Sequence, residues 1–274
     1  MPPSYKPTTF CFADRAKLKG AVDVYISTCP YDKNCAVGQT YGWPMNSWCV
    51  GNVTDMSYLF QDMSTFNEDI SAWDTSSVTN MRNMFTGATS FNGDLSSWNT
   101  SSATLMFGMF QFATSFNSDL SAWDTSNVIE MKGRICIHVC LLCYVFTLLT
   151  DILFIILYSG MFNQATSFNG DLSSWNTSNV VYMSYMFAGA TSFNGDVSSW
   201  DISNVTDFRY MFNGAASFNQ DLCLWKNDFP YGGFIIRDNV VYDNAVGIFT
   251  DSGCTNTSTP QEDQKGPFCA SDCD

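Results

Sequence analysis

Large apolar residues recur along this chain with a period of 25 residues. Seven of the eight tryptophans mark the period: Trp48, Trp73, Trp98, Trp123, Trp175, Trp200 and Trp225. A fixed period of this length is typical of repeat proteins, in which each unit buries its apolar face against the next. The pattern therefore predicts a solenoid of about six units between residues 48 and 225.

Each unit contains one segment with helical spacing. Apolar residues follow each tryptophan at fixed intervals, as in Val78, Met81, Met84, Phe85 and Ala88. At about 100° per residue, these side chains fall on one face of a helix. Ser126 and Asn127, which precede the fourth such segment, suit a helix N-cap. We therefore expect an amphipathic helix in every unit.

A short strand is expected around each tryptophan. In residues 72–76, Trp73 and Thr75 alternate with Asp74, and this alternation favours a strand. One strand and one helix per unit predict an α/β fold. The expected architecture is a leucine-rich-repeat-like solenoid with short parallel strands on the concave face, helices on the other face, and disulfide-bearing caps.

The repeat also resembles a known family. The recurring phrase MFxxATSFNxDLSSWDTSNVTxM is similar to the 25-residue repeat of BspA-like leucine-rich-repeat surface proteins, which is also known from mycoplasma-type surface lipoproteins. The resemblance covers residues 48–225. It implies an adhesion or recognition module exposed at a surface, and it does not imply catalysis.

The one break in the period is a 27-residue hydrophobic insertion at residues 134–160, after which Met161 resumes the register. Residues 135–158 would form about 36 Å of helix, enough to cross a bilayer core of about 30 Å. A looped-out helix that packs on a partner and a translated intron are the alternatives. We favour the intron, because a single span would place the two halves of the solenoid on opposite sides of a membrane. Membrane contact is expected only if residues 135–158 are present in the mature protein.

The charge and the motifs restrict the possible functions. With 26 acidic and 12 basic residues the net charge is −14, which argues against nucleic acid as a partner. The chain has no phosphate-binding loop and no dinucleotide-binding glycine motif. Its only histidine, His138, lies in the insertion. We therefore expect no enzyme activity, no catalytic residues, no cofactor and no metal.

The remaining eight cysteines gather at the two ends: Cys11, Cys29, Cys35, Cys49, Cys223, Cys254, Cys269 and Cys273. Even-numbered clusters predict disulfide-stapled caps at residues 1–47, with a short helix at 14–26, and at residues 226–274. Cys223 with Cys254 is the first pairing expected. Disulfides imply an extracellular or cell-surface location, although no signal peptide is visible.

Potential N-glycosylation triplets also predict a glycoprotein: Asn52, Asn99, Asn176, Asn204 and Asn256. The candidate binding residues follow the tryptophans: Asp74, Asn99, Asp124, Asn176 and Asp201. Stacked at about 4.8 Å, they would form a polar ladder on the concave face. Alternatively, the ladder only binds water and neighbouring strands. Glycans at Asn99 and Asn176 would block it.

A second acidic row beside the Phe-Asn turns is expected to stabilise those turns rather than to bind calcium: Asp69, Asp94, Asp119, Asp171, Asp196 and Asp221. The tryptophans are expected in the core. The predicted function is non-enzymatic recognition of a protein or glycan at a cell surface. The alternatives are a structural cell-covering protein and a glycosidase with paired carboxylates, for which a regular ladder lacks the required asymmetry.

Overall fold

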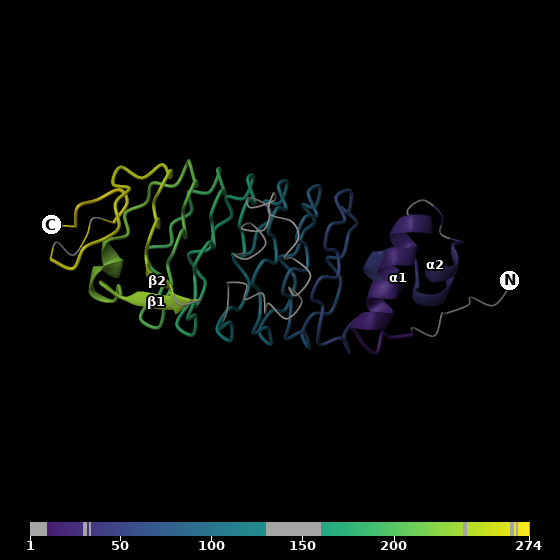
Figure 1. The fold of residues 1–274 in the computed structure, drawn as a ribbon. Helices are drawn as coiled ribbons and strands as arrows, with labels where there is room; N and C mark the ends of the chain where they lie inside the picture. Colours follow the sequence, from purple (N-terminus) through teal and green to yellow (C-terminus); the bar gives the residue numbers. More distant parts are fainter. Residues whose placement is uncertain are drawn as a thin grey trace.

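The computed structural model describes residues 10–29, 32, 34–129, 160–237, 240–263, 266 and 268–273. The chain forms a column of stacked coils between an N-terminal helical cap and an irregular C-terminal cap (Figure 1). The described helices and strands are confined to these ends: α1 (Arg15–Thr28), α2 (Ala36–Tyr41), the 3-10 helices η1 (Met45–Ser47) and η3 (Cys223–Asn227), β1 (Phe234–Arg237) and β2 (Val240–Asp243). The two strands pair antiparallel as a hairpin.

The predicted leucine-rich-repeat-like α/β solenoid is wrong. In residues 48–129 and 160–222 the described chain forms turns and single bridges, with neither the parallel strands nor the helices that were expected. Residues 73–75, where a strand was expected, have no regular structure and lie between two turns. What each unit contributes is a closed coil of loop, held to the next coil by backbone hydrogen bonds.

Left-handed residues explain why the apolar segments are not helices. The residue ten positions after tryptophan has a φ of 52–63° in five coils: Tyr58, Asn83, Gly108, Tyr185 and Tyr210. Such a residue ends a right-handed helix. The amide N–H groups therefore bond to the next coil, as from Phe60 to the Met84 carbonyl oxygen (2.9 Å). A run of tight turns also places apolar residues three or four apart, which is why the spacing imitates a helix.

The expected N-caps have another role. No helix follows Ser126 and Asn127; instead the Asn127 Nδ2 donates to the Ser101 carbonyl oxygen in the preceding coil (2.8 Å). Asn179 and Asn204 make the equivalent bonds, to Ser126 and Ser178. These asparagines join coils rather than beginning helices.

Aromatic rings fill the centre of the column. Within a coil, Phe110 stacks on Phe116 with ring centroids 3.8 Å apart, and it meets Phe162 of the next coil at 5.6 Å. The repeat tryptophans are 1–4% exposed, so their predicted place in the core is confirmed. The indole N–H groups of Trp98, Trp123, Trp175 and Trp200 also bond to an earlier coil, as from Trp98 to the Ile70 carbonyl oxygen (3.1 Å). Ring stacking and these bonds together fix the register of the coils.

The stack is continuous across the insertion. Phe110 N–H donates to the Met161 carbonyl oxygen (2.9 Å), and the Thr125 hydroxyl donates to the Asn176 carbonyl oxygen (3.0 Å). Of the insertion at 134–160, only Gly160 is among the described residues; a Cβ there would lie 2.0 Å from the Tyr185 carbonyl oxygen. The candidate span 135–158 lies outside the described residues, and within them no helix is long and apolar enough to cross a bilayer.

The N-terminal end contains a helix that overlaps the one expected at 14–26. Asp14 is the N-cap of α1, and its side chain accepts from the Lys17 N–H (2.9 Å). The helix therefore begins and ends close to the bounds expected, 14–26. Two disulfides, Cys11–Cys49 and Cys29–Cys35, hold this cap. The short helix α2 was not predicted.

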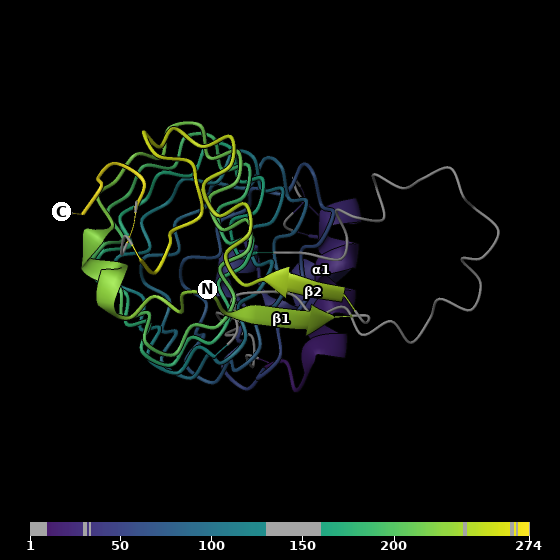
Figure 2. The same ribbon diagram turned by 60° about the vertical axis from the view of Figure 1, so that its left-hand side comes forward.

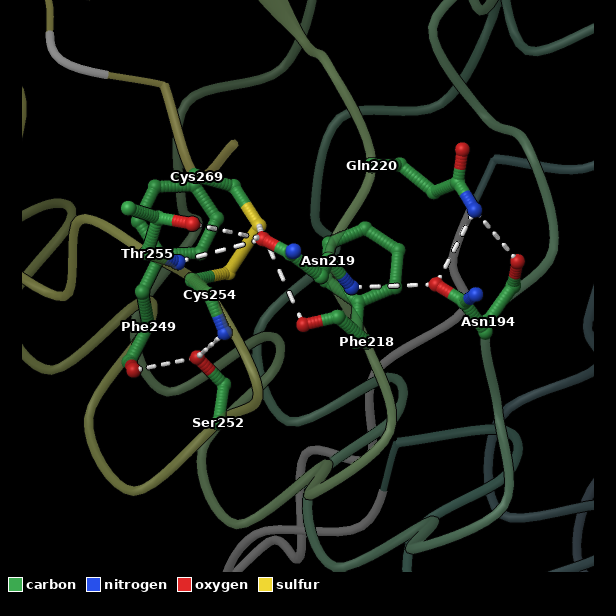
Figure 3. The surroundings of a disulfide bond; sticks show 9 residues. All are labelled: Asn194, Phe218, Asn219, Gln220, Phe249, Ser252, Cys254, Thr255 and Cys269. Carbon is green, nitrogen blue, oxygen red and sulfur yellow. Dashed lines mark hydrogen bonds between the residues drawn. A yellow bond between two sulfur atoms is a disulfide. The ribbon is translucent and has the colours of Figure 1, made fainter. Parts of the chain in front are cut away.

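The C-terminal cap contains one more coil, because Phe212 N–H bonds to the Ile248 carbonyl oxygen. All four of its cysteines are in disulfides, but the expected Cys223–Cys254 pair is wrong: Cys223 bonds to Cys273 and Cys254 to Cys269. Cys254 ends the added coil, where the returning tail brings Cys269 beside it (Figure 3).

Candidate binding surfaces

The five predicted ladder residues are exposed, and each one builds a turn. The Asp74 Oδ1 accepts from the backbone N–H (3.1 Å) and the hydroxyl (2.6 Å) of Ser76. Asn99 makes the same pair of bonds to Ser101 (3.0 and 2.7 Å). This is an Asx turn, in which the side chain satisfies a backbone group two residues ahead. Asp124, Asn176 and Asp201 repeat the arrangement.

Buried threonines align the ladder from coil to coil. The Thr75 hydroxyl donates to the Asn99 carbonyl oxygen and the Thr100 hydroxyl to the Asp124 carbonyl oxygen, both at 3.0 Å. Each of these threonines is 1% exposed. The residues after the tryptophans therefore do form one column, as predicted, but on turns rather than on strands.

Hydrogen bonds keep the ladder carboxylates ionised. The hydroxyl of Ser126, and then its backbone N–H, lower the pKa of Asp124 below its ordinary value. The pKa values of Asp74 and Asp201 are lowered in the same way by Ser76 and Ser203. A carboxyl group that acts as a general acid needs a raised pKa, so these groups suit structure or charge rather than proton transfer.

The second acidic row has the turn-stabilising role that was predicted. In all six coils an Asp Oδ1 accepts from the backbone N–H two residues later, at 2.8–2.9 Å. Beside it runs a ladder of asparagines, whose backbone N–H groups donate to the Oδ1 of the equivalent residue one coil earlier: Asn67, Asn92, Asn117, Asn169, Asn194 and Asn219. Asn219 in turn accepts from the Thr255 N–H (Figure 3).

Another surface was not identified from the sequence. We call it the turn face, and it consists of the residues seven, nine and ten positions after tryptophan: Asp55, Ser57, Tyr58, Asn80, Arg82, Asn83, Leu105, Phe107, Gly108, Tyr182, Ser184, Tyr185, Asp207, Arg209 and Tyr210. Parallel bridges join Asp55, Asn80 and Leu105 in succession. This face varies more in residue type from coil to coil than the ladders do, which hold only Asp and Asn.

The two caps border the turn face. From α1, the Arg15 guanidinium lies 5.7 Å from the centre of the Tyr58 ring. From β2, the Tyr242 ring lies 5.3 Å from the Arg209 guanidinium. In Figure 2, α1 and the hairpin accordingly lie on the same side of the column. The face therefore extends between two structured ends.

An arginine is held between rings at the N-terminal half of this face. The Arg82 guanidinium lies 4.9 Å from the Tyr58 ring centre and 5.1 Å from that of Phe107. Its Nε donates to the Tyr58 hydroxyl (2.9 Å), as does its Nη2. Sequence reasoning missed this site, although a signal exists: Arg82 and Arg209 are the only basic residues in the described part of 48–225.

Two other features lie at the C-terminal end. A hollow of about 500 Å³ is lined by the Phe229 ring, Asn244 and the acidic Asp243, Glu262 and Asp263, among other residues. Asp221 approaches the sulfur atoms of Cys223 and Cys273. Those sulfurs are bonded to each other, so they offer no thiolate to a metal ion.

Comparison with known proteins gives one match. The family described as "Mycoplasma protein of unknown function, DUF285" matches residues 34–136 and 151–229, about two thirds of the chain. No curated protein and no solved structure matches.

Proposed function

The chain belongs to the Mycoplasma DUF285 family, and from that premise we propose that it is a non-enzymatic recognition module whose turn face binds a partner at a cell surface. The resemblance of its repeat to BspA-like surface proteins supports this proposal. The partner is a protein or a glycan, and the stacked coils are the scaffold that presents the binding residues.

The variation between coils carries the proposal. The contacts that hold the stack recur in every unit, from the phenylalanine pairs to the Asx turns. Position nine instead holds Ser57, Arg82, Phe107, Ser184 and Arg209 in successive described coils. Stacking does not require one residue type there. Of these five residues only Arg82 is partly exposed and the other four are buried, so Arg82 is the one that can give specificity for a ligand.

The composition of the turn face fits recognition as well. Tyrosine and arginine, which are enriched at the energetic centres of protein interfaces, gather there. The acidic rows lie elsewhere on each coil and are explained by their turns. This moves the proposed binding site away from the predicted ladder.

The surface location is part of the proposal, and four disulfides support it. Disulfides form and persist in oxidising compartments, such as the outside of a cell. A glycosidase is not favoured, because the ladder carboxyl groups have lowered pKa values, whereas a glycosidase needs one raised carboxyl opposite an ionised one.

A paired array screen tests the function. The full chain is applied to protein and glycan arrays beside two variants, Arg82→Ala on the turn face and Asp124→Asn on the ladder. We expect specific hits that Arg82→Ala loses and Asp124→Asn retains. Hits lost only by Asp124→Asn would show that the ladder, and not the turn face, is the binding site. The absence of hits on both arrays would favour a structural role in a cell covering.

A further inference from the structure

Arg82 and Arg209 occupy the same position in two different coils, and their surroundings differ in one respect. Arg209 has Asp207 two residues earlier: its Nε and Nη2 contact the two carboxylate oxygens, each at 2.9 Å. Both side chains are buried, at 2% and 0% exposed. The backbone N–H of Arg209 also donates to Asp207 Oδ1 (3.2 Å). The charge of Arg209 is therefore neutralised by a carboxylate of the same chain.

At Arg82 the same turn lacks the carboxylate. Asn80 stands where Asp207 stands in the other coil, and its Oδ1 accepts the Arg82 backbone N–H at the same 3.2 Å. The Nε and Nη2 of Arg82 bond to the neutral Tyr58 hydroxyl instead. Within the described part of the chain, no carboxylate forms a salt bridge with Arg82. Arg82 is a partly exposed residue, so a group from outside the chain can reach it.

Arg82 is also fixed in place. Its guanidinium lies 4.9 Å from the Tyr58 ring centre and 5.1 Å from that of Phe107, and the Tyr58 hydroxyl accepts from Nε and Nη2. Within the described part of the chain no hydrogen bond from Nη1 is found, so it can donate to an acceptor from outside. A guanidinium that is already oriented loses little conformational entropy when it binds a carboxylate, and its planar fork matches the two oxygens.

From this comparison we infer that Arg82 is the docking point for an acidic side chain, Asp or Glu, of a protein partner. The inference rests on the proposed recognition function and names the partner chemistry for it. The carboxylate supplies to Arg82 what Asp207 supplies to Arg209. Partly exposed Leu105, which forms a bridge with Asn80, offers an apolar contact near it.

The ring geometry favours a protein over a glycan. Sugars bind aromatic side chains through an open ring face, but two guanidinium groups crowd the Tyr58 ring, at 4.9 Å (Arg82) and 5.7 Å (Arg15) from its centre. Phe107 is 4% exposed. The tyrosine–arginine cluster instead resembles the aromatic and arginine anchors of protein interfaces.

A defined peptide probe tests the inference. A phage-displayed library of random linear dodecapeptides is panned against the full chain with its disulfides intact, and enriched peptides are synthesised. We expect a shared Asp or Glu, and affinity weakened about thirtyfold or more by Arg82→Ala. Arg82→Lys, which keeps the charge but loses the fork, should fall in between. Tyr58→Phe removes only the orienting hydroxyl, so it should cost a few-fold.

The controls separate the possible failures. Thermal unfolding of each variant shows whether the fold is kept, and Asp124→Asn should bind like the parent chain. Enriched peptides without an acidic residue, or equal affinity for Arg82→Ala, would overturn the inference. Binding only to a glycan array would overturn it too, yet would leave the recognition function standing. If neither peptides nor glycans bind, both proposals fail.

Discussion

The indole N–H of Trp175 donates to the carbonyl oxygen of Leu120 at 3.1 Å, across 55 residues of sequence. In the uninterrupted coils the same bond spans 28 residues, as from Trp73 to Met45 and from Trp98 to Ile70. The 27 residues of the insertion account for the difference. The halves before and after the insertion are therefore direct neighbours, which conflicts with a membrane span that separates them.

Deleting residues 134–160 should leave the column intact. Gly133 then takes the place of Gly160 before Met161, and every described contact across the junction keeps its partners. We expect a thermal midpoint equal to or above that of the full chain, measured by circular dichroism. A variant that unfolds or aggregates would mean that the insertion supports the stack. Sequencing the transcript tests the intron interpretation separately.

Removing one ring from the column should be costly. Phe110 is fully buried and stacks on both Phe116 and Phe162, so Phe110→Ala leaves a cavity and should lower the free energy of unfolding by about 3–5 kcal/mol. Leu224 is 71% exposed, and Leu224→Ala is the control, with an expected change within about 0.5 kcal/mol. Urea unfolding measures both; equal effects would contradict the ring column as the core.

The sequence predicted the repeat, the disulfides at both ends and the buried tryptophans, because all three follow from apolar periodicity and cysteine placement. It did not predict the coil. Met81, Met84 and Phe85 have helical spacing, but the left-handed conformation of Asn83 between them is decided by bonds to the next coil. A single unit contains no information about that neighbour, so local propensity pointed to a helix.

The candidate binding site could be predicted only in part from the sequence, for a related reason. Asp74 was chosen because it repeats and faces outward, yet its repetition reflects the Asx turn with Ser76. Arg82 has an equivalent in only one other described coil, at Arg209, so the repeat pattern did not indicate it. In a repeat protein, invariant polar positions indicate the scaffold, and departures from the repeat are the better guide to binding.

The disulfide pairing can be checked without any variant. Peptide mapping under non-reducing conditions should give Cys11–Cys49, Cys29–Cys35, Cys223–Cys273 and Cys254–Cys269. A peptide that joins Cys223 to Cys254 would contradict the C-terminal cap.

The two kinds of disulfide loop should differ in their effect on stability. Cys223–Cys273 closes 50 residues and Cys29–Cys35 closes 6. Replacing both cysteines of a pair by Ala should cost about 4 kcal/mol for the long loop and about 2 kcal/mol for the short one, because the longer loop restricts the unfolded chain more. Guanidinium unfolding of the two double variants tests the order; the reverse order would contradict it.

Acid should weaken the column through its Asx turns. The folded pKa of Asp74, Asp124 and Asp201 is lowered by serine hydrogen bonds, so their contribution to stability is complete above the unfolded value of about 3.9. It is lost as the pH falls through the lowered folded pKa. Asn keeps the same bonds at Asn99 without titrating.

The triple variant Asp74→Asn, Asp124→Asn, Asp201→Asn should therefore lose less stability on acidification than the parent chain. Urea unfolding from about pH 5 to pH 2 measures the difference. Parallel pH profiles for the two chains would show that these turns do not depend on ionised carboxylates.

Every surface assignment rests on one unbroken stack, and the contact between the rings of Phe110 and Phe162 tests it most directly. In the full chain with its insertion, nuclear Overhauser cross-peaks should join these two rings, whose centroids lie 5.6 Å apart, and the Phe110 amide should resist hydrogen exchange because it bonds to the Met161 carbonyl oxygen. Missing cross-peaks together with a rapidly exchanging Phe110 amide would show that the two halves do not stack, and would contradict the account.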